Sequence, residues 1–312
     1  MFDTTKKPSD LRENAAVLAL VSAAGHEWEW HRIAQTVSDT GSAVKVISGE
    51  LTAFDTEDAH ALHALVKDAD LRLAHFSQLI RTEAEDGTRC VSVLDREYPV
   101  NLRAIYNRPP FLFVRGSLTE SDQRSIAIVG TRGASPKGLD QATRLASALA
   151  GQGVTVLSGL ARGIDSAAHR AALSVGGRTA AVMGTGMHRR YPTENSDLAA
   201  EIERSGALVS QFWPDAPPTR WSFPMRNVVM SGMAIGTVVI EASSTSGAKM
   251  QARLALEHGK LVFLIRSLVL GEAWAQDYVD RRGALVVDDV DDVLDRLVQI
   301  SKAEDYGQLR LA

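Results

Sequence analysis

The sequence predicts an α/β protein: a doubly wound, mostly parallel Rossmann-like sheet preceded by a small helical domain. Two observations support this fold class. From residue 125 onward, short strands that are apolar on both faces alternate with alanine-rich amphipathic helices, as parallel strands covered by helices do. The region before residue 90 instead shows apolar side chains at helical spacing and no phosphate-type loops.

Composition sets the broad class. The chain has 312 residues, 45% of them hydrophobic and 23% charged, which is typical of a globular protein of about two domains. Its one cysteine, Cys90, excludes a disulfide framework and a multi-cysteine zinc site. It shows no apolar run long enough to span a bilayer, and its polar start is unlike a secretory signal. We therefore expect a cytoplasmic protein without membrane contact, metal or cofactor.

Charge is distributed unevenly along the chain. The whole sequence carries a net charge of −4, whereas residues 120–270 carry 16 basic and 11 acidic side chains. The flanking segments are both acidic. Anionic ligands are therefore expected in the middle of the chain, although a net +5 over this length is also compatible with ordinary scatter.

The first part of the chain reads as helices followed by a short lead-in. Apolar side chains at helical spacing predict helices over residues 11–24, 28–37 and 56–85. Short apolar runs at 90–94 and 111–114 predict strands, separated by a loop over 98–110. We assign residues 1–90 to the helical domain and 91–312 to the Rossmann-like domain, with a lead-in at 91–124, a core at 125–287 and an acidic C-terminal helix at 288–312.

The core consists of repeated strand, loop and helix units. Strands are predicted at 126–129, 154–157, 180–183, 208–211, 238–240, 261–265 and 285–287. Helices are predicted at 139–150, 166–175, 196–205 and 248–258. Because ligands of such sheets bind at the carboxyl ends of the strands, the loops after the strands are the places to search for a site.

The loop after the first core strand contains Gly130, Thr131 and Arg132 and leads to Ser135, a good helix N-cap. Glycine allows close backbone approach, a helix N-terminus attracts anions, and a guanidinium fits a phosphate. The loop matches neither a GxGxxG fingerprint nor a Walker loop. A tight turn with a surface arginine is the competing interpretation, and the loop alone does not decide between them.

The next loop repeats this composition with Ser158, Gly159 and Arg162. Asp165 and His169 follow four residues apart, a spacing compatible with an acid–base pair or with metal ligands. We favour structural roles for both, because no third ligand or nucleophile is spaced to join them.

Two later loops place aromatic residues beside cations. Residues 184–192 include two arginines and Tyr191, and residues 221–227 bring Phe223 next to Arg226 and Asn227. Rings that stack on bases, together with arginines that follow phosphates, are what a single-stranded nucleic acid requires. Core packing is the competing role for any aromatic residue. It suits Trp213, whereas Phe223 is the better stacking candidate.

A hydroxyl-rich turn after the next strand carries Ser246, Gly247 and Lys249 and also suits a phosphate. Taken together, these loops predict one extended anion-binding edge on a single sheet. Such an edge requires Arg132, Phe223 and Lys249 to lie on one face of the molecule.

From about Tyr98 to Val287 the chain resembles the DNA-processing protein A family (DprA, also called Smf). The similarity rests on several motifs in matching order: YPVNLRAIYNRPPFLFVRGSL, AIVGTRGASPKG, VLSGLARGIDSAAHRAAL, GGRTAAVMGTGMHRRYPTEN, FPMRNVVMSGM and IEASSTSGAKMQA. The helical region resembles that of the family only loosely.

The resemblance implies a non-enzymatic, homodimeric protein that binds single-stranded DNA and assists loading of the RecA recombinase, in recombination or in DNA uptake. Matching positions imply a DNA site made of Gly130, Thr131, Arg132, Ser135, Ser158, Gly159, Arg162, Phe223, Arg226, Asn227, Ser246, Gly247 and Lys249. The chain departs from the family pattern at Gln211, Val228, Gln251 and Arg266, and we expect no winged-helix domain after Val287. With these departures, the sequence does not decide whether the protein loads RecA.

Two other readings remain open. One is a nucleotide sensor or a nucleoside monophosphate phosphoribohydrolase, in which Glu241 acts in N-glycosidic cleavage, although the PGGxGTxxE pattern of those enzymes is absent. The other is a structural partner protein with vestigial phosphate loops.

The sequence also leaves two roles for the apolar segment 268–270 and Trp274. They belong either to a dimer face or to the core.

Overall fold

The computed structural model of the chain describes residues 10–25, 29–53 and 55–309, with side chains up to residue 299. It is an α/β fold built on a nine-stranded sheet in the order β1-β2-β6-β5-β4-β3-β7-β8-β9. The seven strands from β6 to β9 in this order pair in parallel, and the β1–β2 and β2–β6 pairs are antiparallel. The predicted fold class is therefore confirmed.

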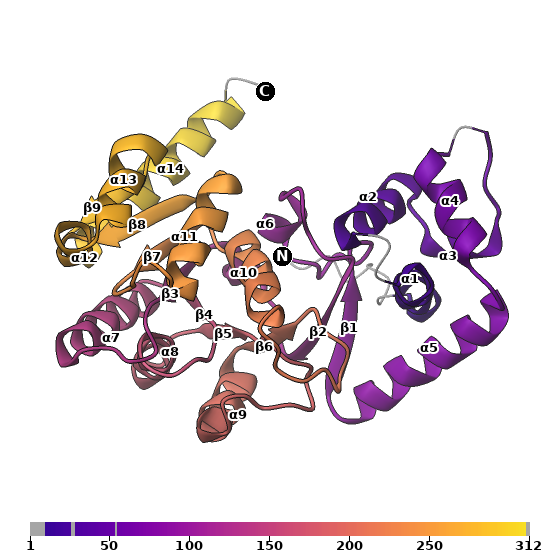
Figure 1. Cartoon of the computed structure of the whole chain (residues 1–312), viewed down its shortest axis with the longest axis horizontal. Coiled ribbons are helices and arrows are strands. Elements are labelled where there is room, and N and C mark those ends of the chain that lie inside the picture. Colours follow the sequence, from indigo (N-terminus) through magenta and orange to yellow (C-terminus); the bar gives the residue numbers. More distant parts are fainter. Residues whose placement is uncertain (1–9, 26–28, 54, 310–312) are drawn as a thin grey trace.

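The helical region precedes the sheet and lies at one end of the molecule, beside β1 and β2 (Figure 1). It consists of α1 (Leu11–Ala24), α2 (Trp30–Thr40), α3 (Ala43–Ser48), α4 (Glu57–Leu65) and α5 (Ala69–Glu85). The stretch predicted as one helix over 56–85 is two helices, because the chain reverses at Asp68, which has a left-handed φ of 53°. Trp28, where the second helix was predicted to begin, lies outside the described residues.

The lead-in segment belongs to the sheet. β1 (Thr88–Ser92) and β2 (Phe111–Gly116) form a hairpin-like pair that joins the sheet through β6 (Ala207–Ser210). The short helix α6 (Val100–Arg103) and the 3₁₀ turn η1 (Glu120–Gln123) complete the segment. Residue 90, the predicted domain boundary, lies within β1, and the division into two domains stays a prediction.

The parallel strands are close to those predicted. They are β3 (Ser125–Val129), β4 (Thr155–Ser158), β5 (Thr179–Val182), β7 (Gly236–Val239), β8 (Leu261–Ile265) and β9 (Leu285–Val287). Alternate side chains of β3 enter different apolar clusters: Ile126 and Ile128 pack with α7, α8 and α14, whereas Ala127 and Val129 pack on the other face of the sheet. Both faces of the sheet are therefore buried.

Helices cover both faces of the sheet. Between β3 and β6 the chain forms α7 (Pro136–Gly151), α8 (Ile164–Ser174), η2 (Thr193–Asn195) and α9 (Ser196–Ser205). Between β6 and β9 it forms α10 (Ser222–Met233), α11 (Gly247–Glu257), α12 (Arg266–Gly271) and α13 (Ala273–Arg282). α14 (Val290–Leu309) packs on α7 through Val293 and Leu297. Within the described part of the chain, none of the helices is both long and apolar enough to cross a membrane.

α10 differs most from the sequence prediction. The Trp-Ser-Phe-Pro run predicts a loop, whereas the structure has a helix there, with Pro224 in its first turn. Proline is tolerated there because the first amide groups of a helix have no intrahelical partner. As a result, Phe223, Arg226 and Asn227 lie on one rigid helix and not on a loop.

Candidate functional site

A cavity lies where the connections leave β3 and β7 in opposite directions. These two strands are neighbours, and the chain continues from β3 toward β4 but from β7 toward β8. Such a switch point creates a crevice at the carboxyl ends of the strands. A cavity of about 310 Å³ occupies it, between the loop after β3, the start of α10 and the start of α11.

The cavity brings together most of the predicted site. Its lining includes, from that prediction, Gly130, Thr131, Arg132, Phe223, Arg226, Asn227, Ser246 and Gly247. A smaller cavity of about 80 Å³ adjoins it and shares Arg132 and Phe223 with it, and Gly159 and Arg162 line that second space. Ser135, Ser158 and Lys249 line neither cavity.

Arg132 and Phe223 meet at the boundary between the two cavities. The Arg132 guanidinium carbon lies 5.2 Å from the centroid of the Phe223 ring, within the range of a cation–π contact. Arg132 is exposed and forms no ion pair with any described residue. The ring of Tyr191 lies 5.9 Å from that of Phe223 on another side. A cation and a ring are thus presented together, with the cation free to bind an anion.

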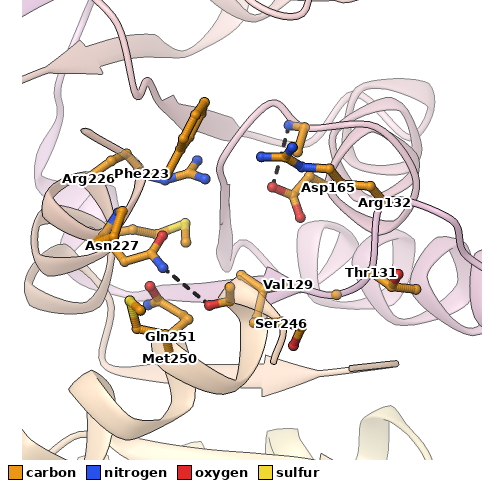
Figure 2. A pocket seen from close by; sticks show the side chains of 16 residues that line it. Val129, Thr131, Arg132, Asp165, Phe223, Arg226, Asn227, Ser246, Met250 and Gln251 are labelled. Atoms are coloured by element: carbon orange, nitrogen blue, oxygen red, sulfur yellow. Dashed lines mark hydrogen bonds between the residues drawn. The ribbon is translucent and has the colours of Figure 1, made fainter. Parts of the chain in front are cut away.

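Arg226 enters the larger cavity from α10, opposite Arg132 (Figure 2). It is 7% exposed, and its Nη1 donates to the Val182 carbonyl at 2.9 Å. Its buried Nε has no hydrogen-bond partner among the described residues. Burial lowers the pKa of Arg226, and the charge of nearby Asp165 opposes that shift. The guanidinium is a buried cation with unused donor capacity.

Gly159 makes room for this guanidinium. A Cβ atom built on Gly159 would lie 1.5 Å from Arg226 Nη1, so no larger residue fits there without moving the arginine. The Gly159 amide donates to the Asp165 carboxylate at 3.1 Å, and the Ala161 amide does so at 3.4 Å. Burial raises the pKa of Asp165, which Arg226 counteracts. Asp165 therefore organises the loop after β4, in keeping with the structural role favoured for it.

The far wall of the cavity is a network of amide groups. Asn227 Nδ2 donates to the Gly247 carbonyl at 3.2 Å and so ties α10 to the start of α11 (Figure 2). The Gln251 side chain is fully buried. Its amide is assigned the orientation in which Nε2 donates to the Asn227 carbonyl at 3.1 Å and Oε1 accepts from the Ser231 amide at 3.2 Å, because that orientation satisfies both ends. Gln251 was noted in the sequence only as a departure from the family pattern. Its position four residues after Gly247, hence on the same helix face, was the signal that could have identified it as a lining residue.

The N-terminus of α7 already holds an anion from the chain itself. The Ser135 amide and hydroxyl both donate to the Glu241 carboxylate, and Ser135 Oγ accepts from the Gly138 amide at 3.0 Å. A Cβ on Gly138 would lie 2.4 Å from the carboxyl carbon of Glu241. The predicted phosphate position at Ser135 therefore coincides with a carboxylate, and Glu241 is engaged as a cap on α7.

Three other predicted residues have partners away from the larger cavity. Ser158 is buried, and its hydroxyl donates to the Ile128 carbonyl at 2.6 Å. Arg162 is exposed and pairs with Glu194 at 2.6 Å. The ammonium of Lys249 lies 5.7 Å from the centroid of the Trp274 ring on α13. Lys249 thus adds no direct contact to the Arg132–Phe223 pair.

His169 has the structural environment that the sequence favoured. It is fully buried, and its Nδ1 lies 2.7 Å from Thr179 Oγ1. Burial, followed by the charge of Arg226, lowers its pKa to about 3. It does not line either cavity. Trp213 is partly buried and packs against the core, next to Phe111 and Phe76.

The sequence is similar to those of known DNA-processing proteins. The family model described as DNA recombination-mediator protein A matches residues 89–298. Protein Smf of Escherichia coli is 39% identical over 203 residues, which are 64% of this chain and 54% of that protein. The DNA processing protein DprA of Bacillus subtilis is 33% identical over 67% of this chain and 71% of its own length. The matched part of this chain thus spans about half of the first relative and more of the second.

Solved structures agree with the fold. The X-ray structure of DNA processing protein A from Streptococcus pneumoniae superposes with a TM-score of 0.65 at 29% identity, covering 91% of this chain and 94% of the other. A structure of DNA processing protein A from Helicobacter pylori gives a TM-score of 0.60 at 23% identity, covering 68% of this chain and 96% of the other. The sequence match, which includes every loop around the two cavities, shows that this chain belongs to the DNA recombination-mediator protein A family.

Proposed function

We propose that this protein is a non-enzymatic recombination mediator that binds single-stranded DNA at the switch-point cavity. One observation carries the proposal. The Arg132 guanidinium, which forms no ion pair among the described residues, meets the Phe223 ring at the rim of the cavity. Arg226 lies buried in the cavity wall, and its Nε has no hydrogen-bond partner in the same part of the chain. Rings of this kind stack on unpaired bases, and guanidinium groups bind the phosphates between them.

The single strand is preferred to a duplex for a physical reason. A base can stack on Phe223 only if it is free of its own stack, and the Phe223 ring is itself half-buried between the two cavities. The Helicobacter pylori relative, whose structure was described for its single-stranded DNA binding mode, supports this choice. The family description as a recombination mediator supports a further part of the proposal, delivery of the strand to the RecA recombinase. Action as a homodimer is proposed from the sequence resemblance alone.

Two of the departures from the family pattern lie away from the two cavities. Gln211 is buried at 4% exposure, and Arg266 forms two 2.6 Å hydrogen bonds to the Asp288 carboxylate. Neither residue lines a cavity. Gln251 does line the larger cavity, where it joins α10 to α11. Of these three departures, only Gln251 therefore lies at the proposed DNA site.

Arg132→Ala tests the DNA site. We expect the variant to bind a single-stranded oligonucleotide about tenfold more weakly, as when one hydrogen bond to a charged group is lost. Because each phosphate contact adds about 0.7 to the salt slope on a single strand, the slope should also become shallower by about that amount. Fluorescence anisotropy across a salt series measures both quantities.

Arg144→Ala is the matched control, because Arg144 is an exposed arginine on α7 that pairs with Asp140 at 2.8 Å and lines neither cavity. It should leave the salt slope close to that of the parent. Equal losses of affinity in the two variants, or none in Arg132→Ala, would show that the strand does not bind at this cavity.

Incubation with nucleoside monophosphates should release no base, since the Glu241 carboxylate accepts hydrogen bonds from Ser135.

A further inference from the structure

A second pair of a cation and a ring lies close to the first. Trp221, directly before α10, is 66% exposed, whereas Trp274 is only 8% exposed. The guanidinium carbon of Arg220 lies 5.0 Å from the centroid of the Trp221 ring. Arg220 forms no ion pair with any residue in the described part of the chain. Arg220 and Trp221 therefore repeat the arrangement of Arg132 and Phe223.

The backbone on both sides of this pair is pinned. The Thr219 amide donates to Ser222 Oγ at 3.1 Å, the Ser222 amide donates to Thr219 Oγ1 at 3.0 Å, and Ser222 Oγ donates to the Thr219 carbonyl at 3.0 Å. These bonds close a turn around Arg220 and Trp221. An exposed indole on a closed turn loses little conformational freedom when a flat ligand stacks on it.

The two pairs lie at the same end of α10. Only one residue separates Trp221 from Phe223, so their Cα atoms lie no more than about 7.6 Å apart. Because residues two apart in a helical turn point to different sides, a ligand that contacts both rings has to pass around the start of α10. Both rings belong to the start of α10, and the adjoining Tyr191, which contacts Phe223, is 42% exposed. A single strand with one base on Phe223 would place a neighbouring base near the exposed Trp221 ring.

We propose that Arg220 and Trp221 form a second nucleotide subsite, in which the indole stacks on the base next to the one held at Arg132 and Phe223. The ligand is a single-stranded polynucleotide, and this subsite extends the cavity site by one nucleotide. The proposal rests on the proposed function. Its specific content is that Trp221, which lines neither of the two cavities described above, contacts DNA.

The test compares Trp221→Ala, Trp221→Phe and Tyr106→Ala with the parent, using an oligothymidylate. Tyr106 is a matched exposed aromatic residue, 62% exposed, and it packs against His258 at the other end of α10 and α11. We expect Trp221→Ala to weaken binding about tenfold, within the range for loss of one base–aromatic stack. Trp221→Phe should keep most of the affinity, and Tyr106→Ala should match the parent.

Tryptophan fluorescence gives a second readout that a merely structural role would not change. A base stacked on the exposed indole should quench part of the emission of the parent, and Trp221→Phe should lose that part of the quenching while it still binds. The Phe variant also covers the case in which Trp221→Ala folds poorly.

The outcomes separate this proposal from the one on which it rests. Unchanged affinity in Trp221→Ala, undiminished quenching in Trp221→Phe, or an equal loss in Tyr106→Ala would each overturn the second subsite. A loss in Arg132→Ala alongside any of these results would leave the cavity as the DNA site. If the parent itself binds no oligothymidylate, both proposals fall, and the exposed Trp221 is then better explained as a contact for another protein.

Discussion

His169 and Arg226 illustrate how burial sets charge near the cavity. Arg226 is a buried cation, and both burial and this neighbouring charge disfavour a second proton on His169. The folded protein therefore holds His169 neutral, hydrogen-bonded to Thr179, at a pH where an unfolded histidine is partly protonated. The stability of the fold should depend on pH through this residue.

The sign of the pH effect follows from the direction of the shift. The pKa of His169 falls from 6.5 to about 3 on folding, so the unfolded chain binds more protons as the pH drops below 6.5. This contribution to stability is complete above 6.5 and is lost progressively toward pH 3. From about pH 7.5 to about pH 5, we expect it to lower the free energy of unfolding by about 2 kcal/mol.

Urea denaturation of the parent and of His169→Gln at the two pH values measures this effect. Glutamine can still bond to Thr179 but does not titrate, so its free energy of unfolding should change less with pH. His258, whose pKa burial lowers to about 4, is present in both proteins and contributes equally to each. An identical pH dependence in parent and variant would show that His169 does not control it.

Among the elements, α7 shows how hydrogen-bond donors at the start of a helix can be paired with a side chain from a distant part of the chain. Ser135 caps the helix and Pro136 occupies its first turn, both of which the sequence shows locally. The Glu241 carboxylate that completes the cap comes from 106 residues further along the chain, directly after β7. A carboxylate at this position also interacts favourably with the helix dipole. It links the loops on the two sides of the switch point.

Glu241→Ala should lower the free energy of unfolding by about 1–2 kcal/mol, because it removes the partner of the Ser135 amide and hydroxyl. Glu257→Ala is the control, since that carboxylate forms an exposed pair with Arg253 one turn away, worth about 0.5 kcal/mol or less. Chemical denaturation of both variants gives the comparison. Losses of the same size would mean that Glu241 does not act as a cap.

At the scale of the whole molecule, aromatic rings join the helical region to the sheet. Trp213, in the loop after β6, lies 5.6 Å from Phe76 of α5 and 5.3 Å from Phe111 of β2, measured between ring centroids. Trp30 of α2 lies 5.3 Å from Phe111 on the helical side. Residues of the helical region and of the sheet accordingly belong to one continuous apolar cluster.

Trp213→Ala should destabilise the protein by about 3 kcal/mol, the lower end of the range for removing a large ring from a core, because Trp213 is partly buried against the core. Far-UV circular dichroism during urea unfolding measures the loss, and hydrogen exchange should show faster opening in α5, which loses the stacking partner of Phe76. Trp221→Ala, which removes an exposed ring, should change stability by about 0.5 kcal/mol or less. A small effect of Trp213→Ala would indicate that the two regions are joined only weakly.

Much of the fold was predictable because its elements carry local signals. α1, α9, β8 and β9 have the predicted bounds, since apolar periodicity over a single element depends only on which face is buried. α12 and α13 were not predicted, and α10 was read as a loop because its aromatic and proline residues resemble loop composition. The hairpin-like β1 and β2 were recognised as strands, but their place at the edge of the parallel sheet depends on pairing with β6.

Local sequence patterns were enough to predict the α/β class, the order of the strands along the chain and the glycine, arginine and aromatic residues in the loops that follow them. Which of these residues share a site depends on the folded chain. It brought Arg132 and Phe223 together, buried Arg226 above Gly159, filled the end of α7 with Glu241 and turned Lys249 toward Trp274. Local patterns arise from neighbouring residues, whereas these contacts join positions far apart in the chain and are settled by packing and by the pairing of buried charges.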